Sequence, residues 1–298
     1  MSDAGAAPAV AALPRGLDPA RAARARWRRT LTPVALIGAT LVGIVVAVAL
    51  AAPVLAPHPP AAQIAKPLLV PGAPGHLLGT DEFGRDELSR LIWGARVSLY
   101  VGGLAVLIAL GLGATAGVIA GFFGGWVDDI IMRIMDVVLS LPALVLAIAI
   151  TSVLGPTLTN AMLAIGLVYA PTFARVARGP TLTVVQVPFI EAARSIGASN
   201  WRIIARHVLP NVMAPILVQM TVSFSTAILT EAALSFLGLG TQPPTASWGL
   251  MLSAARQYML IDPWIAVLPG CAIALTVLGF NLLGDGLRDL LDPRMRTL

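Results

Sequence analysis

Residues 137–174, "VVLSLPALVLAIAITSVLGPTLTNAMLAIGLVYAPTFA", decide how many times this chain crosses a membrane. The stretch has no charged residue, yet as one helix it would extend about 1.5 Å per residue, well beyond the roughly 30 Å hydrocarbon core of a bilayer. It therefore has to fold back. The dipeptide Gly155-Pro156 is typical of a turn, and polar side chains flank it. The stretch thus predicts two membrane helices that are joined at this dipeptide.

The rest of the chain is also rich in apolar residues. Of its 298 residues, 57% are hydrophobic and 12% are charged, and the mean hydropathy is +0.84. This composition fits a soluble domain poorly and a polytopic membrane protein well. Four further uncharged runs can each hold a span of about 20 residues, at 30–57, 97–127, 207–230 and 263–284. The sequence predicts an all-α membrane protein with six transmembrane helices.

The basic residues indicate the orientation of these helices. In a six-span chain, 15 of the 20 Lys and Arg lie on one side, namely Arg15, Arg21, Arg24, Arg26, Arg28, Arg29, Arg133, Arg175, Arg178, Arg194, Arg202, Arg206, Arg288, Arg294 and Arg296. Lys66, Arg85, Arg90, Arg96 and Arg256 lie on the other side. Since cytoplasmic loops carry the excess of Lys and Arg, both termini are predicted to be cytoplasmic.

This orientation divides the chain into five parts. They are a cytoplasmic arm (1–32), a first transmembrane helix (33–55), an external loop (56–96), a five-helix core (97–287) that includes a cytoplasmic loop at 186–208, and a cytoplasmic tail (288–298). The external loop contains alternating acids and arginines from Asp81 to Arg90, which predict a short charged helix. Such a helix either caps the membrane edge or offers a docking surface.

The sequence lacks the motifs of several catalytic classes. Lys66 is the only lysine and no G-x-x-x-x-G-K-[ST] loop is present, so the chain is not predicted to hydrolyse ATP. His58, His76 and His207 are scattered, without an H-E-x-x-H motif or a Cys pair, and no metal site or cofactor is predicted. A helical membrane protein of this kind is most simply part of a transporter, a channel or a receptor.

The cytoplasmic loop contains the stretch "EAARSIGASNWRIIARHVLPN" (191–211). Its periodicity predicts two short amphipathic helices with a turn at Gly197, where glycine can take the left-handed conformation that ends a helix. Their expected apolar faces are Phe189, Ala192, Ala193 and Ile196, and Trp201, Ile204 and Val208. Three functions compete for this loop: a surface that lies on lipid, a DNA-binding helix-turn-helix, and a docking site for a cytoplasmic protein. Membrane spans at both ends disfavour entry into a DNA groove.

The same stretch resembles the "EAA" loop in the permease subunits of binding-protein-dependent ABC importers. The matching residues are Glu191, Ala192, Ala193, Gly197, Leu209 and Pro210, whereas His207 stands where that pattern has isoleucine. Four more stretches resemble the dipeptide, oligopeptide and nickel branch of this family, specifically its C-type subunit. They are "HLLGTDEFGRDELSRLIWGARVSL" (76–99), "GFFGGWVDDIIMRIMD" (121–136), "EAALSFLGLGTQPPTASWG" (231–249) and "FNLLGDGLRDLLDPR" (280–294).

The resemblance implies a type I ABC importer permease in the bacterial inner membrane, which forms half of a pore for dipeptides or oligopeptides. Nickel or another small solute is the alternative substrate, and a membrane-anchored helix-turn-helix regulator is the alternative function. The implied partners are a second permease, two ATPase subunits that hydrolyse the ATP, an extracytoplasmic solute-binding protein and membrane lipid, without nucleic acid. The implied ATPase-coupling residues are Glu191, Ala192, Ala193, Gly197, Trp201, Arg202 and Arg206.

Three polar residues within the predicted spans are candidates for the translocation path or its gate. Glu231 is the strongest, because an ionisable group within a span is costly unless it is paired or hydrated. Gln219 and Asn281 are weaker candidates, since amides often join membrane helices by hydrogen bonds. Glu231 could join helices as well, and the sequence leaves both roles open. Asp136 is expected to pair with Arg133, three residues earlier.

Overall fold

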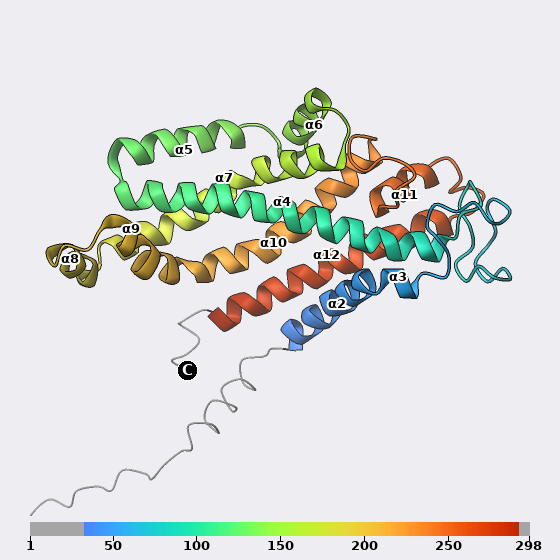
Figure 1. The fold of residues 1–298 in the computed structure, drawn as a ribbon, viewed down its shortest axis with the longest axis horizontal. Coiled ribbons are helices and arrows are strands. Elements are labelled where there is room, and N and C mark those ends of the chain that lie inside the picture. The colour runs from blue at the N-terminus through green and yellow to red at the C-terminus, as the bar shows by residue number, and fades with distance from the viewer. Residues whose placement is uncertain (1–32, 292–298) are drawn as a thin grey trace, which may run out of the picture.

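The computed structural model describes residues 33–291, and the expected arm (1–32) and the end of the tail (292–298) lie outside them. Within these limits the chain consists of helices and irregular loops and has no β-strand beyond three isolated bridges. The helices pack as one elongated bundle (Figure 1). The all-α class predicted from the sequence is confirmed.

Six segments of the described chain are long and apolar enough to cross a membrane, if a bent pair counts as one span. Five are unbroken helices, namely α2 (Pro33–Leu50), α4 (Glu87–Phe123), α7 (Leu158–Val185), the continuous helix Asn200–Phe236, which contains α10 (Leu209–Phe236), and α12 (Trp264–Leu291). The sixth consists of α5 (Gly125–Leu139) and α6 (Ala143–Leu154), which meet at 88°. The predicted count of six therefore holds.

The expected turn at Gly155-Pro156 separates α6 from α7. Gly155 has φ +96°, and the side-chain amide of Asn160 donates to the carbonyl oxygens of Leu154 (2.8 Å) and Gly155 (3.0 Å). The hydroxyl of Thr157 caps α7 by accepting a hydrogen bond from the backbone N–H of Asn160. These side chains satisfy backbone groups that the break leaves without helical partners.

A second break, at residues 140–142, was not predicted. The uncharged run was expected to begin a span at residue 137, but α5 begins at Gly125 and ends at Leu139. Pro142 has no N–H to donate back into α5, and it disfavours helical geometry at Leu141 before it. The chain consequently bends there, and the short helix α6 continues in a new direction.

The bundle core is built on the contact between α4 and α7, the most extensively packed pair of helices. Three glycines of α4 at four-residue spacing, Gly113, Gly117 and Gly121, face α7. A Cβ atom at Gly117 would lie 2.1 Å from the carbonyl oxygen of Ala174, so any side chain there would collide with backbone. Small residues at this spacing let membrane helices approach closely. The repeat is readable in the sequence as three glycines four residues apart.

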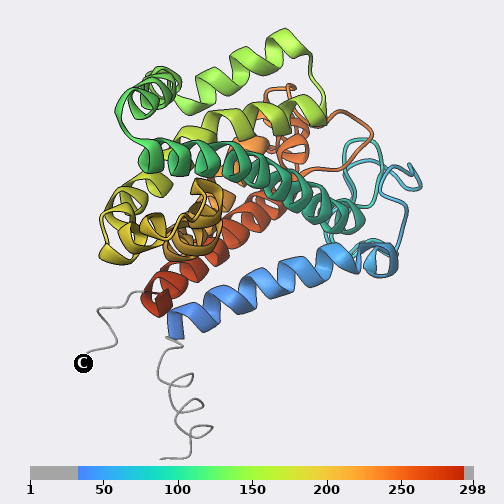
Figure 2. The same cartoon turned by 60° about the vertical axis from the view of Figure 1, so that its left-hand side comes forward.

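The two ends of the bundle differ in character. At one end lie α8 (Pro188–Ser195) and α9 (Asn200–Ile203), and at the other lie the 56–86 loop and α11 (Trp248–Ala255) (Figures 1 and 2). Helix α2 packs antiparallel on α12, with Gly38 against Leu283 and Ala35 against Gly286. The start of α2 therefore lies beside the end of α12.

The 56–86 loop differs from its predicted structure, which included a short charged helix. Beyond α3 (Ala52–Leu55), residues 56–86 contain no helix, and the predicted short charged helix does not exist as a separate element. Instead α4 begins at Glu87, ten residues before the expected start of its span. Asp86 caps this helix, and its carboxylate accepts a hydrogen bond from the backbone N–H of Ser89 at 2.8 Å.

Candidate functional site

Residues 186–208, which the sequence predicts to couple to an ATPase, contain α8, a turn, α9 and a π-helical turn, and we call them the coupling segment. Helix α8 ends at Ser195 with Ile196 as its C-cap, and Gly197 follows with φ +78°, as the sequence predicts. The N–H of Gly197 donates to the carbonyl of Arg194 (2.9 Å), and the N–H of Ala198 donates to that of Ala193 (3.1 Å). This pair of bonds is the Schellman arrangement that closes a helix at a left-handed glycine.

The buried faces of the coupling segment differ from those expected. Phe189, Ile196 and Trp201 were expected to pack but are exposed, Ile196 by 85% and Trp201 by 65%. The side chains that anchor the segment to the core are those of Ile190, Ala193, Ile203, Ile204 and Val208. Ala193, Ile204 and Val208 are therefore buried as predicted, whereas Ile190 and Ile203 take the buried positions expected for their neighbours on the helices. Three large apolar side chains are thus left on the surface.

The remaining candidate coupling residues lie on the same surface. Glu191, Ala192, Arg202 and Arg206 are exposed, as is Gly197. Of the seven coupling residues that the sequence proposes, Ala193 alone is buried. The exposed side of the segment therefore combines apolar side chains with arginines of two successive turns.

Local contacts hold the coupling segment in place. The guanidinium of Arg194 lies 5.4 Å from the ring centroid of Phe122, near the end of α4. The ring of His207 lies 5.8 Å from that of Phe189, so this departure from the family pattern makes a packing contact. His207 belongs to a π-helical turn, η1 (Ile204–Val208), which joins α9 to α10 without a break. Such turns occur often at functional sites.

Two ion pairs connect α5 with α7. Arg178 binds both carboxylate oxygens of Asp128, and Arg175 contacts Asp136 at 2.7 Å. Asp136 was expected to pair with Arg133 on its own helix, and this expectation is wrong. Arg133 is exposed, whereas Arg175 reaches Asp136 from a helix packed alongside.

Glu231 is fully buried within the chain. Its carboxylate accepts hydrogen bonds from Ser235 (2.8 Å) on α10, from Ser98 (3.2 Å) on α4 and from Thr241 (3.4 Å) in the loop after α10. Among the described residues, no charged side chain pairs with this carboxylate. Hydroxyl groups alone therefore offset the free-energy cost of burying it. The arrangement joins three parts of the fold at one side chain.

Gln219 lines a hollow of about 510 Å³ between α7, α10 and α12, which we call the inner hollow. Asn211 and Arg288 contribute further polar groups to its lining, and Val176, Pro180, Ala214, Pro215, Val218 and Leu291 supply apolar surface. The amide of Gln219 also donates to the hydroxyl of Ser223 at 3.0 Å. Glu231 and Asn281 do not line this hollow, and Asn281 is exposed on α12. The structure therefore does not bring the three path candidates together.

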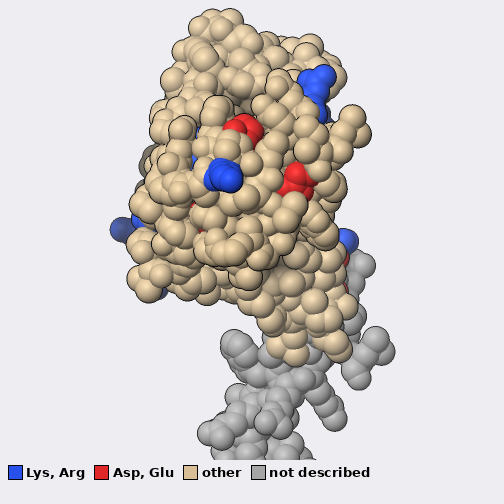
Figure 3. Space-filling view, turned by 90° about the vertical axis from the view of Figure 1, so that its right-hand side faces the viewer, with Lys and Arg blue, Asp and Glu red and all other residues tan. Residues whose placement is uncertain are grey.

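Most charged side chains between Asp81 and Arg90, where the sequence predicted a short charged helix, are buried. Asp81 binds the Nε atoms of Arg85 (2.6 Å) and Arg90 (3.2 Å), and all three side chains are less than one-tenth exposed. Figure 3 shows this end of the molecule as a mostly uncharged surface with isolated acidic and basic patches. Burial raises the pKa of Glu82 beside this network. These buried ion pairs stabilise the conformation of the loop.

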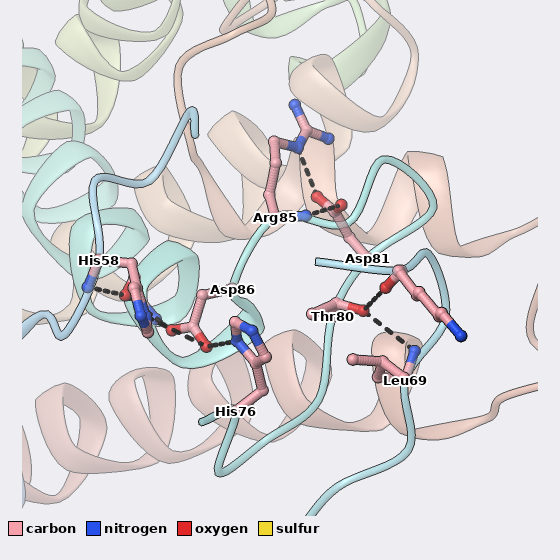
Figure 4. Close-up of polar contacts among 9 residues, drawn as sticks. His58, Leu69, His76, Thr80, Asp81, Arg85 and Asp86 are labelled. Carbon is pink, nitrogen blue, oxygen red and sulfur yellow. Dashed lines mark hydrogen bonds and ion pairs between the residues drawn. The ribbon is translucent and has the colours of Figure 1, made fainter. Parts of the chain in front are cut away.

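The same loop brings together two histidines that are far apart in the sequence, His58 and His76. The rings of His58 and His76 lie 5.2 Å apart on either side of Asp86 (Figure 4). Burial works to raise the pKa of Asp86, but hydrogen bonds from His76 and Ser89 outweigh it and hold this pKa below its usual value. Nothing in the sequence spacing of these residues indicates that they meet.

Comparisons with known proteins agree with this fold. The chain is 47% identical to the dipeptide transport system permease protein DppC of Alkalihalophilus pseudofirmus, over 88% of this chain and 86% of that protein. It is 48% identical to the di/tripeptide permease DppC of Pseudomonas aeruginosa (88% and 89%) and 44% identical to the glutathione permease GsiD of Pectobacterium atrosepticum (91% of each).

A solved structure shares the fold at low sequence identity. The inward-facing MetNI methionine ABC transporter matches with a TM-score of 0.56 and 18% identity, over 69% of this chain and 97% of that chain. A family model described as "Binding-protein-dependent transport system inner membrane component" matches residues 113–297, which includes the coupling segment, the inner hollow and Glu231. The chain belongs to this family of inner-membrane components of binding-protein-dependent transport systems.

Proposed function

We propose that this chain is a permease subunit of an ATP-driven importer and forms half of a pore with a second, similar permease. Dipeptides or short peptides are the proposed cargo. The support is that three relatives at 44–48% identity are named as dipeptide, di/tripeptide and glutathione permeases. These names favour peptides over nickel. Specificity for one peptide would also depend on the solute-binding protein that delivers it.

We further propose that ATPase subunits dock on the coupling segment and hydrolyse the ATP. The observation that carries this proposal is that Phe189, Ile196 and Trp201 are exposed on a segment whose other face is anchored by buried side chains. Exposed apolar residues that are held on a rigid base are typical of protein–protein contacts. The helix from α9 through η1 to α10 is continuous, so movement of a docked partner would be transmitted directly to a membrane span.

The inner hollow is the proposed part of the translocation path that this chain contributes. Its volume of about 510 Å³ lies within the roughly 300–1,000 Å³ of small-molecule sites. Arg288 offers a positive charge for a carboxylate, and Gln219 and Asn211 offer amides, which are the groups that a peptide backbone requires. Glu231, in contrast, has hydroxyl partners within its own chain, and we propose that it joins helices and does not contact cargo.

The proposed orientation places the coupling segment in the cytoplasm and the 56–86 loop outside. It rests on the distribution of basic residues, and the two sets of elements lie at opposite ends of the bundle (Figure 1). The ends of α2 and α12 that lead to the two termini are also side by side, which supports placing both termini on one side.

Cysteine labelling tests this orientation. In a chain with Cys271 replaced by Ala, we expect Leu260→Cys to react with an impermeant maleimide added outside sealed cells, and Ser199→Cys to react only after the cells are opened. Leu260 is 98% exposed and Ser199 is also exposed, so both thiols are accessible within the chain. Labelling of Ser199→Cys in sealed cells would contradict the orientation and, with it, docking of cytoplasmic ATPases on this segment.

A further inference from the structure

The 56–86 loop brings a carboxylate and two imidazoles to one point, which we call the loop cluster (His58, His76 and Asp86). Nδ1 of His76 lies 2.8 Å from Oδ1 of Asp86, and Nδ1 of His58 lies 3.8 Å from the same oxygen. One potential ligand atom from each residue lies within 4.8 Å of the other two. The side chains of His76 and Asp86 are less than one-tenth exposed (Figure 4).

Hydrogen bonding within the chain does not account for the whole cluster. Nδ1 of His58 is buried and has no hydrogen-bond partner, alone among the buried side-chain nitrogens and oxygens of residues 33–291. Burying a polar atom without a partner costs about 1–3 kcal/mol, and such atoms are rare in folded proteins. A His–Asp hydrogen bond that only stabilises the loop requires His76 and Asp86. It does not explain why the ring of His58 lies beside them.

The surroundings of Asp86 fix one carboxylate oxygen and leave the other, Oδ1, with the ring of His76 as its hydrogen-bond partner. Oδ2 already accepts hydrogen bonds from the N–H (2.8 Å) and hydroxyl (2.7 Å) of Ser89, which fix the carboxylate. The backbone N–H of His58 donates to the same hydroxyl at 3.0 Å, so Ser89 also holds His58 beside the carboxylate. Oδ1 is left facing both rings. Groups that orient metal ligands in this way are characteristic of metal sites.

We propose that the loop cluster binds a divalent transition-metal ion, with Zn²⁺ as the best-fitting ion, through Nδ1 of His58, Nδ1 of His76 and Oδ1 of Asp86. Two histidines and one carboxylate form an established ligand set for Zn²⁺, with water in the fourth position. Ligand atoms about 2.1 Å from a tetrahedral ion lie about 3.4 Å from each other. The two distances from Oδ1 to the imidazoles, 2.8 and 3.8 Å, bracket that value, and one ligand atom from each residue lies within 4.8 Å of the other two, so binding requires side-chain rotations that draw the three ligand atoms to this spacing.

A bound ion would join three separate parts of the chain. His58 follows α3, His76 lies in the middle of the loop and Asp86 caps α4. The ion would therefore clamp the 56–86 loop onto the start of α4. Coordination at Nδ1 requires His76 to carry its ring proton on Nε2, so the ion takes the place of the hydrogen bond between His76 and Asp86.

Zn²⁺ titration of the full-length chain, with a histidine-free tag, against a fluorescent chelator tests the site. We expect one Zn²⁺ per chain, with Mg²⁺ unable to compete because it prefers oxygen ligands. His58→Gln and His76→Gln should each weaken binding at least about 10- to 100-fold. His58→Gln removes a ring nitrogen that makes no hydrogen bond, so this variant should fold normally. His207→Gln, which alters the remaining histidine, is the matched control and should bind as the unaltered chain does.

A second readout follows the loop itself. Lys66 is the only lysine of the chain and is exposed in this loop, so a protease that cleaves on the amino side of lysine cuts the chain at one site, the Ala65–Lys66 bond. We expect Zn²⁺ to slow this cleavage in the unaltered chain and in His207→Gln but not in His58→Gln. The proposal is overturned if the chelator-stripped chain takes up no Zn²⁺ in competition with the chelator. It is equally overturned if His58→Gln binds Zn²⁺ as tightly as His207→Gln does.

Discussion

Gly197→Val is expected to uncouple the permease from its ATPase subunits while all six spans stay inserted. Gly197 has φ +78°, and a β-branched residue resists this conformation by about 1–2 kcal/mol. A Cβ atom at this position would meet no other atom of the chain within 4 Å, so the expected effect comes from the backbone and from the docked partner. If the strain opens the turn, docking should weaken about 5- to 30-fold.

The measurement is co-purification of the ATPase subunits, together with substrate-stimulated ATP hydrolysis in reconstituted complexes. Gly197→Asn is the matched control, because asparagine tolerates the left-handed conformation far better than valine does. We expect the asparagine variant to keep most of the stimulation. A valine variant that retains both properties at the level of the unaltered chain would show that the coupling segment does not dock the ATPase.

Glu231→Leu is expected to destabilise the bundle strongly. The carboxylate is the acceptor for Ser98, Ser235 and Thr241, and each buried hydroxyl that loses its acceptor costs about 1–3 kcal/mol. We therefore expect a lower midpoint of thermal unfolding in detergent and less folded protein in the membrane. The loss should appear in the purified chain without any substrate, because the contacts lie within one chain.

Glu231→Gln separates this role from a role in transport. An amide keeps one acceptor oxygen, and the neighbouring hydroxyls can rotate to meet its N–H donors, so the cost should stay near the average of about 0.6 kcal/mol for such bonds in membranes. Peptide uptake by this variant should be close to that of the unaltered chain. Loss of uptake with normal stability would instead place Glu231 on the path or at its gate.

The number of spans was predictable from the sequence because burial in lipid requires long apolar runs, and these are readable without knowledge of tertiary structure. The turn at Gly155 was predictable for the same local reason. The bend at 140–142 was missed because the apolar run continues through it, and hydropathy alone does not distinguish a straight span from a bent one. Pro142 is the local signal that could have located it.

The candidate sites were less predictable, because they depend on contacts between distant segments. Gly197 could be located because its conformation is local, but the exposed face at Ile196 and Trp201 depends on how the segment packs on the core. Asp136 pairs with a residue 39 positions away, and His58, His76 and Asp86 meet through an irregular loop. No periodicity relates such residues, and therefore sequence spacing alone could not bring them together.

Photo-cross-linking from the coupling segment tests the central claim most directly, namely that this segment docks the ATPase. A photoreactive amino acid replaces Ile196, which is 85% exposed, or in a control chain Leu260, which is 98% exposed at the opposite end of the bundle. With the importer assembled in membranes, we predict an adduct with the ATPase subunit from position 196 and none from position 260. An adduct with the ATPase from position 260, or an adduct with lipid alone from position 196, would contradict the account.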